Sequence, residues 1–292
     1  MFPSVTPFRV PRNTSVFSID VEDWFHIMDL PSAPPLEQWQ ELPSLVERNF
    51  FALLDMLDAR TVSSTCFFLG WVAERYPHIV REAAARGHEV ASHGYGHGLV
   101  YEMSAADFLA DITRAKALLE DVAGRSVQGY RAPAFSVTAD TPWFFDRLAQ
   151  AGYRYSSSVF PGGRVHGGMR TFTMAPCIVD TPHGPIYEFP ISVTPVFGIP
   201  RCFFGGGYLR LSPYPVVKWF GRRVLADGRP LVFYLHPREI DPTHPRFDTP
   251  FIRRVKLYSG LRSTAAKLNH ICGDFSFLSF AALLPGVHHG AD

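Results

Sequence analysis

Short apolar segments alternate with longer amphipathic segments between residues 16 and 158, and this alternation constrains the fold more than any other feature of the sequence. The apolar segments, expected as buried strands, are 16–19, 63–70, 88–94 and 127–132. The amphipathic segments, expected as helices, are 43–59, 77–87, 104–124 and 141–151. Strands that alternate with helices of 10–20 residues predict a mostly parallel sheet with helices packed outside it. We therefore expect an α/β fold, either a barrel or a doubly wound sheet.

The segment 104–124 carries the clearest helix boundaries in the chain. Ser104 stands where an N-cap is expected, and Asp107 occupies the position of the acidic partner in a capping box. Gly124 follows the last periodic residue, where glycine commonly ends a helix.

The second half of the chain breaks the alternation. Residues 160–230 are rich in Gly, Pro and aromatic side chains, so we expect an insertion of loops and short strands there. A strong buried strand returns within 229–241, and the tail 242–292 contains an expected helix near 259–272. We predict an N-terminal arm (1–15), a catalytic domain (16–240) that carries the insertion, and a C-terminal extension (241–292).

Charge and composition exclude several classes of protein. The 292 residues include 28 basic and 27 acidic side chains, a net charge of +1, which gives no reason to expect nucleic acid or an anionic membrane as partner. The four cysteines lie far apart, so a structural zinc cluster is not expected. We find no run of 18 apolar residues and no apolar stretch typical of a signal peptide, and we expect a cytoplasmic protein without a transmembrane segment.

Acidic and histidine side chains follow two of the predicted strands. Asp20, Glu22 and Asp23 come directly after strand 16–19, and His93 and His97 stand at the end of strand 88–94. Two histidines four residues apart can share one side of a helical turn, and with a carboxylate they offer three ligands to a catalytic metal. A second carboxylate would then remove a proton from water. The alternatives are a solvated turn or Asp23 capping a short helix that starts at Trp24, and two polar histidines in a glycine-rich loop.

Two further strand ends carry candidate residues. In GYRAPAFS (129–136), Arg131 is placed to orient a carboxylate or hold substrate, and the amide of Ala134 to face a developing oxyanion. In YLHP (234–237), His236 is placed to act as a general acid. Taken alone, an ordinary salt bridge and a buried core histidine remain open for Arg131 and His236.

The order of these motifs, D-x-E-D, H-x-x-x-H, R-x-P and L-x-H, each after a predicted strand, resembles the polysaccharide deacetylase family, carbohydrate esterase family 4. The resemblance spans about residues 16–240. DVEDWF, GYRAPAFS, GGGYLRL and FYLHPREID, together with the tail, are similar to a subgroup found with exosortase and exopolysaccharide gene clusters, which has its own C-terminal extension.

The resemblance implies a distorted (β/α) barrel and a hydrolase that uses one divalent metal, usually zinc, to remove acetyl groups, above all N-acetyl groups, from a polysaccharide or its precursor in exopolysaccharide biosynthesis. It implies that His93 and His97 bind the metal, that Asp20 is the general base and that His236 is the general acid. It further implies that Arg131 tunes the base and that the Ala134 amide binds the oxyanion. The third metal ligand stays open between Glu22 and Asp23.

One departure from the family pattern concerns the acid. Members usually carry an Asp that pairs with the acid histidine, whereas this sequence has Ser156 at that place. His236 would then lack a carboxylate partner, unless Asp140, Asp180 or another acid substitutes. The departure keeps open a weakly active or inactive carbohydrate-binding protein, and relatives of the fold keep open an amidohydrolase of a small cyclic amide.

For an oligosaccharide or polysaccharide substrate, we expect Trp24 and Phe135 to line a groove for the sugar rings.

Overall fold

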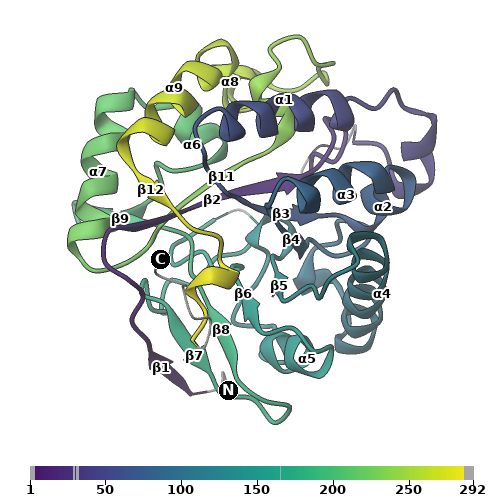
Figure 1. Ribbon diagram of the computed structural model, residues 1–292, viewed down its shortest axis with the longest axis vertical. Helices are drawn as coiled ribbons and strands as arrows, with labels where there is room; N and C mark the ends of the chain where they lie inside the picture. Colours follow the sequence, from purple (N-terminus) through teal and green to yellow (C-terminus); the bar gives the residue numbers. More distant parts are fainter. Residues whose placement is uncertain (1–3, 29, 31–32, 165, 286–292) are drawn as a thin grey trace.

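The computed structural model describes residues 4–28, 30, 33–164 and 166–285, and its centre is a curved sheet with helices around its outside (Figure 1). Neighbouring strands β8, β6, β5, β4, β3, β2 and β11 pair in parallel in that order. Their bounds are Thr14–Val21 (β2), Thr65–Phe68 (β3), Glu89–Ser92 (β4), Gly129–Tyr130 (β5), Tyr155–Ser156 (β6), Ile186–Glu188 (β8) and Leu231–Leu235 (β11).

Other strands extend this parallel core. β7 (Cys177–Val179) joins β8 in antiparallel fashion, and β1 (Val5–Pro7) joins β7 in the same way. β12 (Ser276–Phe277) pairs with the start of β2, while β9 (Thr194–Val196) and β10 (Ile199–Arg201) form a separate hairpin. Within the described residues, the main path of paired strands ends at β1 and at β11.

Helices surround the sheet (Figure 1). The α-helices are α1 (Val46–Asp58), α2 (Gly70–Arg75), α3 (Pro77–Ala85), α4 (Ala105–Ala123), α5 (Phe144–Gln150), α6 (Gly206–Leu211), α7 (Tyr214–Ala226), α8 (Phe251–Tyr258) and α9 (Leu261–Asp274). Short 3-10 helices cover Leu36–Glu41, Val100–Glu102, Pro133–Phe135, Pro237–Ile240 and Ala281–Leu283. None of the helices in the described part of the chain is long and apolar enough to cross a membrane.

Side chains of β2 alternate between two apolar layers, because successive side chains of a strand point to opposite faces. Phe17, Ile19 and Val21 belong to the large core that includes buried side chains of α1, α3 and α4. Val16 belongs to a second core inside the curved sheet, with Phe67 from β3 and other buried residues. Asp20 shares the face of Val16, which directs its carboxylate toward the inside of the sheet. The expected α/β fold with a barrel-like sheet is confirmed.

The predicted helices of the first half are confirmed, and α4 shows why. The Ser104 hydroxyl accepts a hydrogen bond from the amide of Asp107, and Gly124 ends the helix in a left-handed conformation. Both termini therefore follow from local side-chain and backbone chemistry, which the sequence displays directly.

The region 160–230 contains more helix than expected. Its hairpin and loops are accompanied by α6 and by the 13-residue α7. Val217, Gly221 and Val224 form the buried face of α7, at a helical spacing that the high content of Gly, Pro and aromatic residues obscured. The tail contains the expected helix as α9, preceded by α8, which was not predicted.

Candidate metal and catalytic site

The ends of the parallel strands bring the predicted acidic and basic side chains together. Asp20 is the penultimate residue of β2, and Glu22 follows that strand directly. His93 follows β4, Arg131 follows β5 and His236 follows β11. Because parallel strands all end at the same edge of the sheet, residues from distant parts of the chain meet at one place.

The two histidines lie in a loop rather than on a helical turn. Gly94 turns this loop with φ +77°, and a Cβ at Gly94 would lie 2.9 Å from the Asp111 carboxylate, which accepts from the amide of Tyr95. His97 itself has φ 57°, an uncommon conformation for a residue other than glycine. The loop thereby turns both imidazoles toward the end of β2. The two histidines thus face the same side, as expected, although no helical turn places them there.

Glu22 makes the closest contacts with both histidines. Its Oε1 lies 3.1 Å from His93 Nε2 and 2.9 Å from His97 Nε2, and all three side chains are buried. Burial alone would raise the pKa of the Glu22 carboxyl, but the neighbouring histidines, His97 first, hold that pKa well below its ordinary value. The three ligand atoms lie within 4.8 Å of one another.

The protonation of His93 tests whether this trio fits a metal. His93 Nδ1 lies 2.8 Å from the carbonyl oxygen of Arg131, which can only accept, so Nδ1 carries the proton. In the neutral imidazole, Nε2 then presents a lone pair to Glu22 Oε1, a second acceptor. A cation bound by both atoms relieves this conflict, and a histidine oriented by a carbonyl is typical of metal ligands. The trio therefore fits one divalent metal ion.

Asp23 points elsewhere and serves the fold. Its carboxylate accepts hydrogen bonds from the Ser44 hydroxyl and from the amides of Trp24, Leu45 and Val46 at the start of α1. This arrangement corrects the view that Asp23 and Glu22 are equal candidates for the third ligand. It also differs from the predicted alternative, in which Asp23 capped a helix beginning at Trp24, because the capped helix is α1.

Asp20 forms a buried ion pair with Arg131. Asp20 Oδ1 lies 2.7 Å from Arg131 Nη1, which also donates to the Ser18 hydroxyl at 2.8 Å. Arg131 is fully buried, its Nε donates to the carbonyl oxygen of Ser157, and its guanidinium lies 4.2 Å above the Phe67 ring. Arg131 is thus fixed on several sides and orients Asp20. The other oxygen, Oδ2, lies 3.9 Å from His236 Nε2.

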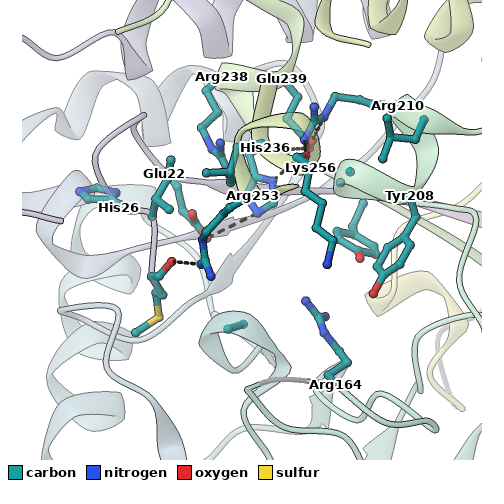
Figure 2. Close-up of a pocket in the computed structure, with 18 of the residues that line it drawn as sticks. Glu22, His26, Arg164, Tyr208, Arg210, His236, Arg238, Glu239, Arg253 and Lys256 are labelled. Carbon is teal, nitrogen blue, oxygen red and sulfur yellow. Dashed lines mark hydrogen bonds and ion pairs between the residues drawn. The ribbon is translucent and has the colours of Figure 1, made fainter. Parts of the chain in front are cut away.

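His236 receives its carboxylate partner from Glu239 (Figure 2). His236 Nδ1 lies 3.0 Å from Glu239 Oε2, and Glu239 Oε1 accepts from Arg210 Nε at 2.7 Å. Burial opposes a charged imidazole, but Glu22 and Glu239 together raise the pKa of His236. Glu239 had no predicted role, although its position three residues after His236, across Pro237, was a signal for a side-chain contact at a helix start.

None of the three residues considered for that partner contacts His236 in the structure. Ser156 donates to the Ser158 hydroxyl at 2.8 Å. Asp180 accepts from the Ser4 hydroxyl, and Asp140 lies in an exposed turn. The carboxylate that contacts His236 is therefore that of Glu239, an acid other than Asp140 and Asp180.

His26 is a further buried histidine that had no predicted role. Its Nδ1 accepts from the amide of Asp23 at 3.0 Å, so the proton of the neutral ring lies on Nε2. Burial and the neighbouring His97 lower the pKa of His26 well below its ordinary value, which keeps the ring neutral. His26 therefore offers a fixed N–H donor beside the metal ligands.

A cavity of about 340 Å³, here called the inner cavity, opens onto this cluster (Figure 2). Glu22, His97, His236 and Ala134 line it, and Tyr208, 44% exposed, lines it from α6. The side chains of Trp24 and Phe135 are absent from its lining.

The predicted sugar-binding role of these two rings is thereby corrected. Trp24 is 7% exposed and donates from its indole N–H to the carbonyl of Pro43, and Phe135 is 4% exposed and packs on Tyr234. Contacts with residues distant in the sequence bury both rings.

Comparisons with known families divide the chain near residue 156. Residues 41–156 match the polysaccharide deacetylase family, and residues 157–285 match a domain of unknown function, DUF3473. The DUF3473 match covers residues 241–285 of the predicted C-terminal extension (241–292) and begins before it. The predicted domain boundaries at 15 and 240 stay predictions.

Two curated proteins are similar to parts of the chain. A peptidoglycan-N-acetylglucosamine deacetylase of Bacillus cereus is 31% identical over 81 residues, which are 28% of this chain and 30% of that protein. A chitooligosaccharide deacetylase of Azorhizobium caulinodans is 29% identical over 126 residues, 43% of this chain and 50% of that protein. The chain thus spans half or less of these relatives.

Solved structures share the fold over almost the whole chain. PuuE allantoinase has a TM-score of 0.60 at 16% identity, and the match covers 93% of this chain and 89% of that protein. The Bc1960 peptidoglycan N-acetylglucosamine deacetylase has a TM-score of 0.51 at 17% identity, covering 95% of this chain and 91% of its own. With the family match and the shared fold established, the protein carries a domain of the polysaccharide deacetylase family, followed by a DUF3473 domain.

Proposed function

We propose that the protein is a metal-dependent deacetylase that removes N-acetyl groups from a polysaccharide or oligosaccharide. The observation that carries this proposal is the convergence of Glu22, His93 and His97 beside the buried pair of Asp20 and Arg131. The family match and the names of the two curated relatives support the reaction.

In this proposal Glu22, His93 and His97 would bind one divalent metal ion. Zinc is suited to a site made of two imidazoles and one carboxylate. When bound there, such an ion would supply Lewis acidity toward the acetyl carbonyl and the attacking water. The carbonyl of Arg131 fixes the His93 tautomer so that Nε2 keeps its lone pair for the ion.

Asp20 acts as general base in this scheme. One of its oxygens is held by Arg131, while the other lies on the side of His236 and is available to accept a proton from water as it attacks the acetyl carbon. The Ala134 amide, in a turn where φ is 53°, is proposed to donate to the oxygen that becomes negative.

His236 acts as general acid and delivers a proton from Nε2 to the leaving nitrogen. Glu239 accepts from Nδ1, so the proton to be delivered stays on the nitrogen that faces the cavity. The products are acetate and a free amine on the sugar.

The polymer itself is assigned by resemblance. The similarity to proteins of exopolysaccharide gene clusters supports an exopolysaccharide or its precursor as substrate. The cytoplasmic location stays a prediction.

Metal removal tests the reaction. Purified protein is expected to release acetate from N-acetylglucosamine oligomers, to lose this activity with a chelator, and to regain it when zinc is added back. His93→Ala should contain no stoichiometric metal, whereas the control His78→Ala changes an exposed histidine on α3 and should retain it. Full activity after complete metal removal would contradict the mechanism.

The same assay separates the two alternatives. An inactive carbohydrate-binding protein would bind oligomers without releasing acetate, but Glu239 now supplies the carboxylate whose absence motivated that alternative. An amidohydrolase of small cyclic amides would hydrolyse such amides and leave the oligomers intact.

A further inference from the structure

A second cavity, here called the outer cavity, adjoins the inner one and has a volume of about 700 Å³. Its described lining contains four cationic side chains and no carboxylate, although the whole chain has a net charge of only +1. The four cations are Arg164, Arg170, Arg253 and Lys256. Arg164, Arg253 and Lys256 also line the inner cavity, so the positive charge continues up to the proposed reaction centre.

Arg164 is held in place by aromatic rings and not by an acid. Its guanidinium lies 5.0 Å from the ring of Phe135 and 5.0 Å from the ring of Phe160. Its Nη1 is buried without a hydrogen-bond partner among the described residues. A guanidinium oriented in this way loses little conformational entropy when it binds a carboxylate or phosphate.

Arg170 and Lys256 also have no acidic partner among the described residues. In the described part of the chain, no carboxylate oxygen lies within 4.0 Å of the charged groups of Arg164, Arg170 or Lys256. Arg238 in the inner cavity is 9% exposed, and its Nε and Nη1 are buried without hydrogen-bond partners among those residues. Buried donors of this kind cost free energy unless a ligand accepts from them.

The cations come from separate elements that converge. Arg253 and Lys256 are three residues apart on α8 and so share one face of that helix. Figure 2 shows Lys256 and Arg164 extending from opposite sides into the same part of the cavity. Gly163 makes room for Arg170, because a Cβ there would lie 2.7 Å from Arg170 Nη2.

We infer that the outer cavity binds an acidic group, a carboxylate or a phosphate, carried by the substrate beside the N-acetyl sugar. The inference rests on the proposed deacetylase function and adds the chemical class of its substrate. It assigns a role to the DUF3473 domain, since all the cations that line the two cavities lie within residues 157–285.

Three N-acetylglucosamine compounds test this inference. Hyaluronan tetrasaccharide carries carboxylates, uridine diphosphate N-acetylglucosamine carries a diphosphate, and chitotetraose is neutral. We expect kcat/KM for one of the acidic compounds to exceed that for chitotetraose at least about tenfold, and added salt to reduce this preference. The compound that is preferred identifies the acidic group.

The double variant Arg164→Gln/Lys256→Gln should reduce that preference about tenfold, mainly through KM. Arg81→Gln, which removes an exposed arginine from α3, should leave the preference unchanged. Equal kcat/KM for acidic and neutral compounds, or an unaltered preference in the double variant, would overturn the inference.

Calorimetric binding to Asp20→Asn separates this inference from the proposed function. If the wild type releases no acetate from any compound, the deacetylase proposal fails. Tighter binding of an acidic compound that is lost on adding Arg164→Gln/Lys256→Gln would still support the outer cavity as an anion site, whereas equal binding of all three compounds would reject it.

Discussion

The cluster around Glu22 and the outer cavity around Arg164 adjoin each other but are built in different ways. In the cluster, the buried carboxylates have close partners: Asp20 pairs with Arg131, and Glu22 Oε1 lies against the Nε2 atoms of two histidines. In the outer cavity, Arg164 and Lys256 have no such partner among the described residues. The cluster lies at the ends of parallel strands, and the outer cavity is lined by loops and by helices α6 and α8.

This difference suggests a division of roles. Groups that must keep a fixed geometry are buried and paired, so that their orientation does not depend on the substrate. Groups that recognise a substrate must remain available to it, so their charges are left unbalanced. The following predictions test whether substitutions of the paired groups change the chemistry or the stability and leave binding in the outer cavity unaffected.

The largest effect is expected for Asp20→Asn. Because Asp20 is the proposed base and is bound by Arg131, the variant should lose activity by about 10²–10⁴-fold and still contain metal. Acetate release and metal analysis of the same sample measure both. Loss of the metal would instead make Asp20 a ligand, since it also lies near Glu22 and His236.

Glu239→Gln should reduce kcat by about 10–100-fold without changing metal content. The amide cannot stabilise a charged His236 as the carboxylate does, although it keeps a similar shape. Asp180→Asn is the matched control, because Asp180 contacts Ser4 far from the cluster. Steady-state kinetics on one oligomer compare the two, and equal kcat values in both variants would remove Glu239 from the mechanism.

Asp23→Ala should lower the stability of the fold, because Asp23 has no role in the proposed reaction. The change removes the carboxylate that accepts from the amides of Leu45 and Val46 at the start of α1 and from the amide of Trp24, and it should lower the unfolding free energy by about 2 kcal/mol. Urea unfolding measures the loss. A variant as stable as the wild type would show that the backbone amides find other acceptors.

The last prediction concerns Glu188, which no step of the proposed reaction uses; it lies opposite Ser156 in the sheet, where the two matched regions meet. Burial raises the pKa of Glu188 to about 7. The folded state therefore holds its proton over a pH range in which the unfolded state has released it, and stability should fall as pH rises from about 4.5 to 7.

Glu188→Gln cannot ionise and should remove this contribution, which is on the order of 3 kcal/mol. Unfolding measured at several pH values should show that the free energy of unfolding of the variant increases relative to that of the wild type as pH rises toward 7. A constant difference between the two proteins across that range would mean that Glu188 does not titrate there.

The sequence revealed the cluster because strand ends leave local patterns. Asp20, His93, Arg131 and His236 each follow a recognisable apolar segment, and the parallel sheet brings such ends together. The third ligand could not be chosen in this way. Regular alternation stops at Val21, and the hydrogen bond from the Glu22 amide to the Asp20 carbonyl redirects the chain, so that Glu22 turns inward.

Other features depend on contacts between distant residues. Trp24 is buried by Phe247, which is more than 200 positions away, and so it cannot bind sugar as expected. The cations of the outer cavity lie in segments without strand periodicity, so no local pattern showed that they would gather. Glu239 was visible in the sequence, but only the structure shows that it takes the place of an acid expected elsewhere in the chain.

Metal content of Glu22→Gln and Asp23→Asn, measured side by side, tests the central claim most directly. The two residues are adjacent in sequence, both are buried acids, and each substitution keeps the shape of the side chain. We predict that Glu22→Gln loses stoichiometric metal and acetate release, while Asp23→Asn keeps both. Metal retained in Glu22→Gln and lost in Asp23→Asn would contradict the proposed site.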